Sequence, residues 1–186
     1  WSSDVCSSDL VNPTGPLHVG HARGAVFGST LAKILEATGY SVQREYYIND
    51  AGSQLDKFNN SLYARYQQAI GLESRLPVDG YHGKYLIELA EELAKNFNCE
   101  MESEDTQKKI KKLGELGLQK MIEFIKYDMQ EIRVSYDNWF SERSLFSGGQ
   151  YQKVMQLLED SSYLNFQDGA TWFTSTSLGE DKDNVL

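Results

Sequence analysis

The feature that most constrains this chain is a stiff loop that runs directly into a helical pattern. Residues 12–24 read Asn-Pro-Thr-Gly-Pro-Leu-His-Val-Gly-His-Ala-Arg-Gly. Pro13 and Pro16 disfavour a helix up to Leu17, because each lacks the N–H that a helix interior uses, and Gly15 between them favours a tight turn. A helix in this part of the chain is therefore expected to begin only after the loop.

A helix is expected to follow the loop and to lead into a strand. Apolar residues recur every three or four positions as far as Gly39, which ends the helix because glycine readily adopts the positive φ of a C′ residue. Residues 41–47 then read as a strand. His18 and His21 therefore lie at a helix N-terminus, inside a β-loop-α-β unit. The apolar positions of the helical stretch are Val19, Phe27, Leu31, Ile34 and Leu35.

This position has a chemical meaning, because a helix N-terminus presents unsatisfied N–H groups and the positive end of the helix dipole to anions. His18 and His21 lie near one side of the first turn and can donate hydrogen bonds to phosphate oxygens. Gly20 between them leaves room for a flat ring against the backbone. The stretch has neither the G-x-G-x-x-G spacing of redox-dinucleotide sites nor the Gly-Lys-Ser/Thr of P-loops. It suits a nucleotide whose phosphates are being rearranged.

A structural explanation of the same residues stays open at this point. Histidines at a helix start are commonly surface or packing groups. Gly20, Gly24 and Gly28 could serve only to let a helix pack closely on a sheet. A membrane helix is excluded, because Arg23 and Lys33 interrupt the apolar run.

The residues that flank the histidines narrow these alternatives. The block from Asn12 to Ala25, together with Tyr-Tyr-Ile-Asn-Asp-Ala-Gly-Ser-Gln at residues 46–54, resembles the arginyl-tRNA synthetases. Its His-Val-Gly-His tetrad is similar to the first signature of class I aminoacyl-tRNA synthetases, and the wider block is much more specific than the tetrad. The resemblance covers about residues 11–186. Further similar stretches are residues 79–83, 139–142 and 168–173.

The resemblance implies an α/β fold. It is the first half of a class I synthetase Rossmann-like catalytic domain, a parallel β-α-β unit, with a mostly helical insertion that carries a small β element. Residues 11–54 would form the nucleotide-binding half, and residues 55–186 the insertion and the β element, truncated before the second half of the catalytic domain. The lysine-rich second signature of the class is absent from the sequence. The chain is therefore expected to be an incomplete fragment and to be inactive alone.

The implied function is that of an arginine–tRNA ligase, which activates L-arginine with ATP and transfers it to tRNA-Arg. By resemblance, His18 and His21 are catalytic residues that act on the ATP phosphates, and Asn12 contacts arginine. Mg²⁺ is expected to arrive with ATP and not in a protein-bound metal site, and the expected location is the cytoplasm. The other implied ATP-binding residues are Thr14, Gly15, Pro16 and Gly20. A loop over the site is implied to contact ATP or the tRNA end through Asn49, Asp50, Gly52 and Gln54. For Asn49 and Asp50 the alternative is turn chemistry alone.

Composition excludes several classes of protein. Hydrophobic residues make up 40% and charged residues 24%, as in ordinary soluble proteins, and no apolar run is long enough to span a membrane. The net charge of −9 argues against a nonspecific nucleic-acid binder. The lysines at 108, 109, 111 and 112 could still hold tRNA locally, or could be the solvated face of a helix. Two cysteines allow neither a disulfide framework nor a four-ligand zinc site, which favours a reducing compartment.

The rest of the chain is mostly helical by pattern. Apolar steps predict helices over residues 54–70, 81–97, 103–133 and 149–160. Ser103 provides an N-cap for the third of these. A short aromatic strand is expected over residues 134–140, and the β-rich runs around Asp168-Gly169 predict a hairpin. In the fourth helix, the residues expected to face inward are Tyr151, Val154, Met155 and Leu158.

The first ten residues do not fit this pattern. Members of the family resembled here carry an apolar strand with a Glu five positions before the residue equivalent to Asn12, where this chain has Ser7. The decapeptide Trp-Ser-Ser-Asp-Val-Cys-Ser-Ser-Asp-Leu also reads as the translation of a common sequencing-library adapter. We expect residues 1–10 to be foreign to the protein, which leaves Cys99 as its only genuine cysteine.

Three rival functions remain at this stage. The cysteinyl-tRNA synthetases have a similar His-Ile-Gly-His-Ala-Arg block, but carry a zinc-binding Cys just before it, where this chain has Val11-Asn12. Small pantetheine-type adenylyltransferases are disfavoured by the insertion over residues 55–160. From a different class, a non-catalytic synthetase-like protein would only bind a partner, and the intact histidines argue against it.

Overall fold

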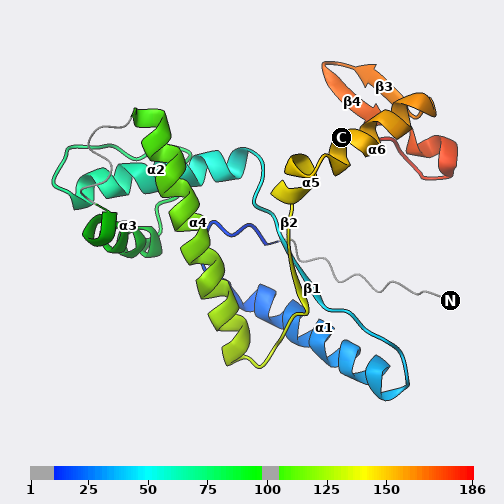
Figure 1. The fold of residues 1–186 in the computed structure, drawn as a ribbon, viewed down its shortest axis with the longest axis horizontal. Helices are drawn as coiled ribbons and strands as arrows, with labels where there is room; N and C mark the ends of the chain where they lie inside the picture. Colours follow the sequence, from blue (N-terminus) through cyan, green and yellow to red (C-terminus); the bar gives the residue numbers. More distant parts are fainter. Residues whose placement is uncertain (1–10, 98–104) are drawn as a thin grey trace. The chain divides into compact units, whose positions relative to one another are not determined.

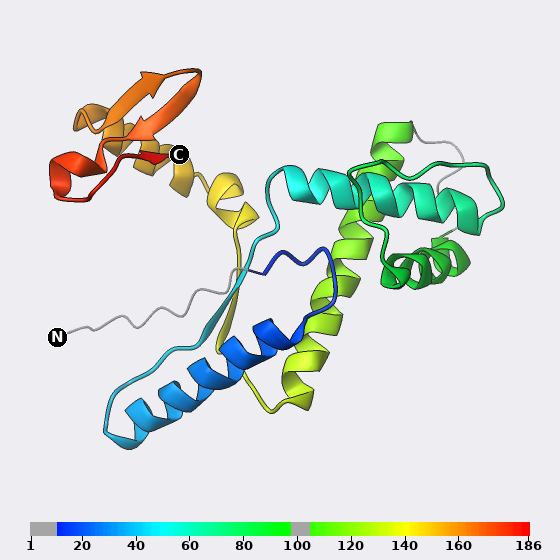
Figure 2. The same cartoon turned by 180° about the vertical axis from the view of Figure 1, so that it is seen from behind.

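The computed structural model describes residues 11–97 and 105–186. The chain divides into two units, one ending at Glu142 and the other beginning at Arg143. Figure 1 shows the elements of both along the sequence, and Figure 2 shows them from behind. The decapeptide at residues 1–10, Cys99 and the predicted N-cap at Ser103 lie outside the described residues. Among the described residues no helix has the length and apolar character needed to cross a bilayer.

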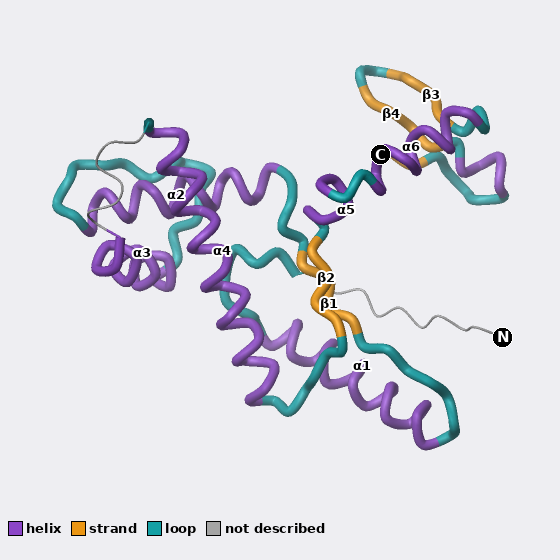
Figure 3. Tube along the Cα trace, viewed as in Figure 1, coloured by secondary structure: helices purple, strands orange, loops and turns teal. Residues whose placement is uncertain are grey.

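A parallel sheet joins segments of the first unit that are far apart in the sequence. Strand β1 (Glu45–Ile48) pairs in parallel with β2 (Asn138–Ser141). On its other side, Ile48 of β1 forms a parallel bridge with Val11, which directly precedes the loop at residues 12–17, here called the signature loop. Helix α1 (Val19–Ala37) leads from this loop to β1, as Figure 3 shows. The predicted parallel β-α-β arrangement is confirmed.

Three helices connect β1 with β2: α2 (Ser53–Ala69), α3 (Lys84–Phe97) and α4 (Thr106–Glu131). They pack on each other around a shared core, and at Gly117 of α4 an added Cβ would collide with the Leu62 side chain of α2. Strand β2 of the sheet therefore lies within residues 55–186, the range predicted for the insertion. The buried members of the core are Phe58, Leu62, Tyr66, Leu86, Leu89, Ala90, Leu93, Leu113 and Met121.

Helix α4 connects this core to a second one under the sheet. Its C-terminal half contributes Ile125 and Met129, which are buried with Val11, Tyr46, Ile48 and Val134. The ring of Tyr46 stacks on Trp139 with centroids 4.5 Å apart and meets Tyr136 edge-on at 5.2 Å. One long helix therefore holds the sheet and the helical insertion in a single unit.

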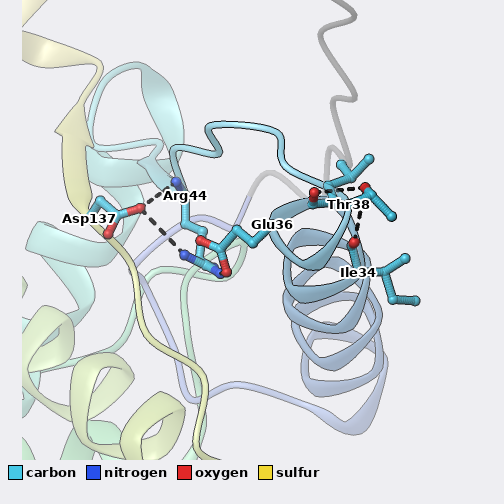
Figure 4. Close-up of polar contacts among 6 residues, drawn as sticks. Ile34, Glu36, Thr38, Arg44 and Asp137 are labelled. Carbon is cyan, nitrogen blue, oxygen red and sulfur yellow. Dashed lines mark hydrogen bonds and ion pairs between the residues drawn. The ribbon is translucent and has the colours of Figure 1, made fainter.

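Hydrogen bonds and an ion pair hold the segment that connects α1 to β1 (Figure 4). The Arg44 backbone N–H donates to Asp137 Oδ2 at 2.7 Å, and Arg44 Nη2 lies 2.6 Å from Glu36 Oε2. Thr38 closes the end of α1 by donating its hydroxyl to the carbonyls of Ile34 and Leu35. Arg44 thus joins α1, β1 and the segment before β2.

The second unit contains the predicted hairpin. Strands β3 (Leu164–Gln167) and β4 (Ala170–Phe173) pair antiparallel, and both turn residues, Asp168 and Gly169, have the positive φ of a type I′ turn. A short strand β5 (Asn184–Val185) adds to β4 after the 3₁₀ helix η1 (Ser175–Leu178). Neither β5 nor the short helix α5 (Arg143–Ser147) was predicted.

The inward face expected for the fourth helix is wrong at two of its four residues, since only Met155 and Leu158 are half-buried. On α6 (Gln150–Asp160), Tyr151 and Val154 are exposed, because the short elements of the second unit do not cover that face and Tyr151 packs on Phe146 instead. The apolar steps of α1 likewise do not mark a buried stripe. Its residues Val19, Phe27 and Ile34 are exposed, and Ala32 is buried. Periodicity identified both helices, but neither face is covered within its own unit.

Helix α3 begins three residues later than predicted, at Lys84. The preceding residues form a turn, in which the Gly80 N–H donates to the Pro77 carbonyl. The Tyr81 N–H donates to the Ser61 hydroxyl of α2 at 2.9 Å instead of entering a helix. This bond to α2 sets the position of Tyr81.

Candidate functional site

The two histidines cap the N-terminus of α1 reciprocally. His18 is the N-cap, with φ −110° and ψ 169°, and its Nδ1 accepts the N–H groups of Gly20 at 3.1 Å and His21 at 3.4 Å. In return, His21 Nδ1 accepts the backbone N–H of His18 at 3.4 Å. This is the geometry of a capping box, built here from imidazoles. The predicted placement of both histidines at a helix start is confirmed.

These bonds fix the tautomer of each ring. A neutral imidazole has one acceptor nitrogen and one donor, so a ring whose Nδ1 accepts carries its proton on Nε2. The two rings are stacked, with centroids 3.5 Å apart and planes 21° from parallel. The turn therefore carries two Nε2–H donors next to the positive end of a helix, which is a suitable environment for an anion.

Gly20 makes room for this arrangement. A Cβ at Gly20 would lie 2.9 Å from His18 Cε1 and 3.0 Å from Nδ1, closer than side-chain carbons normally approach. The flat ring that lies against the Gly20 backbone in this structure is therefore the imidazole of His18. A side chain at this position would push His18 out of its capping geometry.

The signature loop is held from both sides. Pro13 is fully buried and Thr14 is 5% exposed. Asn12 Nδ2 donates to Gln54 Oε1 at 2.5 Å, which joins the start of the loop to the first turn of α2. Asn12 and Gln54, predicted separately as site residues, are thus brought together.

Two tyrosines that were not predicted as site residues complete this arrangement. The Tyr81 hydroxyl accepts from Thr14 Oγ1 at 3.0 Å and donates to Gln54 Oε1 at 3.3 Å. The Tyr85 hydroxyl donates to the Thr14 carbonyl at 2.5 Å. Burial raises the pKa of Tyr85 to about 12, so its hydroxyl keeps its proton and can donate well above neutral pH. The available sequence signal was the similarity at residues 79–83, which includes Tyr81 but gave it no role.

The loop after β1 is tied to the sheet. Asp50 is 6% exposed, and its Oδ2 accepts from Ser141 Oγ of β2 at 2.7 Å. Gly52 precedes α2 with a φ of 85°, and Asn49 is half-buried. The Asp50 contact spans 91 positions in the sequence, so this carboxylate does more than shape a local turn.

On α4, Lys108 and Lys111 are exposed, whereas Lys109 and Lys112 are half-buried.

A family model described as class I tRNA synthetases (R), catalytic domain, matches residues 7–183. The chain belongs to this family. An arginine–tRNA ligase of Dehalococcoides mccartyi is 51% identical over 178 residues, which cover 94% of this chain and 32% of that protein. The arginine–tRNA ligase of Bacillus subtilis is 42% identical over 175 residues, with the same coverage of 94% and 32%. The chain thus spans about a third of the length of these relatives.

Solved structures agree with this assignment. A Campylobacter jejuni structure, reported as a candidate arginyl-tRNA synthetase, is 34% identical with a TM-score of 0.79, over 94% of this chain and 38% of that one. The arginyl-tRNA synthetase of Thermus thermophilus has a TM-score of 0.60 at 22% identity, over 95% of this chain and 31% of that one, and supports the fold alone. The described residues have the fold of the first part of a class I synthetase catalytic domain.

Proposed function

We propose that this chain is part of an arginine–tRNA ligase that activates L-arginine with ATP and transfers it to tRNA-Arg. The observation that carries the proposal is the paired histidine cap at the end of the signature loop, in a chain that belongs to the arginine branch of class I synthetases. The cysteinyl and adenylyltransferase alternatives lose their support, because curated arginine–tRNA ligases match almost the whole chain at 42–51% identity.

In the proposed reaction the arginine carboxylate attacks the α-phosphorus of ATP, a new C–O–P linkage forms, and pyrophosphate leaves. His18 and His21 donate their Nε2–H groups to phosphate oxygens. Donors fixed in advance by the capping bonds stabilise charge as it develops, without the cost of reorienting. Thr14, Gly15 and Pro16 would shape the loop under ATP.

Asn12 is the proposed contact for arginine, and Gln54 holds its amide in place. In this proposal, Gly20 leaves room for the His18 ring and lies on the adenine side of the ATP site. Asn49, Asp50 and Gly52 are proposed contacts to ATP or the tRNA end. Mg²⁺ would accompany the ATP phosphates, which together with water satisfy its preference for oxygen ligands. The proposed location is the cytoplasm.

Arginine-dependent ATP–pyrophosphate exchange tests the proposal. The assay uses the ligase completed to the length of its relatives, and labelled pyrophosphate should enter ATP with arginine and not with cysteine. Exchange that depends on cysteine would assign the chain to the rival synthetase. Binding of tRNA-Arg without any exchange would make it the non-catalytic synthetase-like protein.

We propose that residues 11–54 form the nucleotide-binding half of the catalytic domain and that the helices that follow form the insertion.

We further propose that residues 1–10 are foreign, because they match a sequencing adapter and have Ser7 where the family carries Glu. The family match begins at residue 7, inside this decapeptide. Sequencing reads that continue at full depth from codon 1 through codon 12 in the source genome would refute that part of the proposal.

A further inference from the structure

A hydrogen-bonded network connects the helical insertion to the signature loop. It consists of Asn12, Thr14, Gln54, Tyr81 and Tyr85, and is here called the loop network. From Asn12 the contacts run to Gln54, then to the Tyr81 hydroxyl and the Thr14 hydroxyl, while Tyr85 binds the Thr14 carbonyl. The donors and acceptors alternate consistently along this path, so every bond can exist at the same time.

The signature loop depends on such outside partners. Pro13 and Pro16 have no N–H, and the loop has no helix or strand ladder to satisfy its backbone. Thr14 is almost fully buried, so without the Tyr85 hydroxyl its carbonyl would be left with no donor among the described residues. A buried carbonyl in that state is costly and would shift the loop toward water.

The two tyrosines are themselves held by the insertion core. The Tyr81 N–H donates to the fully buried Ser61, whose hydroxyl donates to the Lys57 carbonyl. At Gly80 an added Cβ would collide with the Ser61 hydroxyl, so the turn can lie this close to α2 only with glycine there. Lys57 Nζ pairs with Asp79 Oδ2 at 2.8 Å on the outside of the same turn.

Tyr85 is fixed by packing. Both Tyr81 and Tyr85 pack against the buried core of α2, α3 and α4, and Tyr81 meets the ring of Phe58 edge-on at 6.2 Å between centroids. A Cβ at Gly83 would lie 2.5 Å from Tyr85 Cε1, so this glycine leaves the space that the Tyr85 ring occupies. The tyrosine hydroxyls are therefore presented from a rigid support.

We propose that Tyr81 and Tyr85 are positioning residues through which the helical insertion sets the geometry of the arginine- and ATP-binding loop. The inference rests on the function proposed above, because it takes Asn12 and the Thr14–Pro16 turn as the substrate contacts. Tyr85 acts on the ATP-binding part of the loop through the Thr14 carbonyl. Tyr81 acts on both the ATP-binding and the arginine-binding parts, because it joins Thr14 to Gln54, which holds Asn12.

The test compares three tyrosine-to-phenylalanine variants of the full-length ligase. Tyr81→Phe and Tyr85→Phe each remove a hydroxyl of the loop network, and Tyr63→Phe is the matched control, because Tyr63 packs against the same core from α2. Arginine-dependent ATP–pyrophosphate exchange should fall roughly 10- to 100-fold in the first two variants, as expected for a displaced binding loop. Tyr85→Phe should raise mainly the KM for ATP, and Tyr81→Phe the KM values for both ATP and arginine.

Hydrogen exchange provides a readout that does not depend on activity. In Tyr81→Phe and Tyr85→Phe, the amides of Thr14, Gly15 and Leu17 should exchange faster, while those of the α2 core, around Phe58 and Leu62, stay as in the parent.

The inference would be overturned if Tyr81→Phe and Tyr85→Phe had the same KM and kcat as Tyr63→Phe and the same rates of amide hydrogen exchange in the signature loop. Faster exchange of the loop and the core together would also overturn it, because the tyrosines would then be ordinary stability residues. A parent ligase that shows no ATP–pyrophosphate exchange would instead refute the proposed function. The rates of amide hydrogen exchange in the loop and in the core would still decide whether the tyrosines position the loop.

Discussion

The imidazole rings of His18 and His21 lie stacked 3.5 Å apart, and each Nδ1 accepts a backbone N–H from the other end of the same turn. In the proposed reaction, this relationship gives each histidine two roles. One nitrogen stabilises the start of α1, and the other carries the proton that a phosphate oxygen would receive as a hydrogen bond. The two roles can be separated by substitution.

We expect His18→Ala and His21→Ala to lower both the rate of adenylate formation and the stability of α1. Loss of one pre-organised donor should cost about 2.7–4 kcal/mol in the transition state, or roughly 100- to 1000-fold in kcat. Loss of a cap should cost about 0.5–2 kcal/mol of stability. Exchange kinetics and thermal unfolding of the full-length ligase measure the two effects.

The matched variants His18→Asp and His21→Glu keep the caps. Asp is among the best N-cap residues, Glu at the third helical position completes a capping box, and neither carboxylate has an N–H to donate. Both should hold the parental melting temperature and still lose the rate. If they keep near-parental kcat, the histidines act only as caps and the catalytic assignment is wrong.

Tyr46→Phe should stabilise the protein. The Tyr46 hydroxyl is buried and has no hydrogen-bond partner among the described residues, while its ring packs between Tyr136 and Trp139. Removing a buried hydroxyl that forms no bond and keeping the ring should raise the free energy of unfolding by about 1 kcal/mol. Urea unfolding followed by tryptophan fluorescence measures this change. Tyr136→Phe is the control, and a loss of stability in Tyr46→Phe would show that the hydroxyl has a partner after all.

Local patterns were sufficient for the elements whose cause is local. The turn at Asp168-Gly169 was predicted, because few residue pairs accept positive φ at both positions. Helix α1 and its N-terminus at His18 were predicted from the Pro/Gly loop and the apolar steps. That the histidines themselves form the cap was not, because imidazole is not among the usual capping groups.

Contacts between distant residues had no comparable signal. Tyr85 and Thr14 are 71 positions apart, and Ser141 and Asp50 are 91 apart. Nothing in the spacing of either residue specifies its partner, since the approach depends on how α2, α3 and α4 pack. For the same reason, the pairing of β1 with β2 was visible only once the structure placed them side by side.

Stability should fall at alkaline pH because of the buried tyrosines. Burial raises the pKa of Tyr85 to about 12 and raises those of Tyr46 and Tyr136 above their usual range near 10. Each folded-state tyrosine thus holds its proton more tightly than in the unfolded chain. Its contribution is complete below pH 10 and is lost as the pH rises through the folded-state pKa.

For Tyr85 this loss should be on the order of 2 kcal/mol between about pH 10 and 12. Urea unfolding of the parent and of Tyr85→Phe at pH 8 and at pH 11 checks the sign. The gap in stability between the two proteins should narrow at the higher pH. A gap that widens would mean that Tyr85 ionises more easily in the folded state than outside it.

Gly117→Ala should destabilise the protein although alanine favours helices. In an open helix this change would gain about 1 kcal/mol. At Gly117, however, the new Cβ would collide with a terminal methyl of Leu62 and lie 3.4–3.5 Å from the Phe58 ring, and both side chains are fully buried. Overpacking of a closed core costs about 1–3 kcal/mol, so after the helix gain the net loss should be up to about 2 kcal/mol. Glu115→Ala, on the exposed side of α4, is the control and should change stability by less than about 0.5 kcal/mol. Thermal unfolding of both variants gives the comparison. A melting temperature for Gly117→Ala at or above that of the control would mean that α2 and α4 can move apart without cost, and that the glycine is not needed for their close approach.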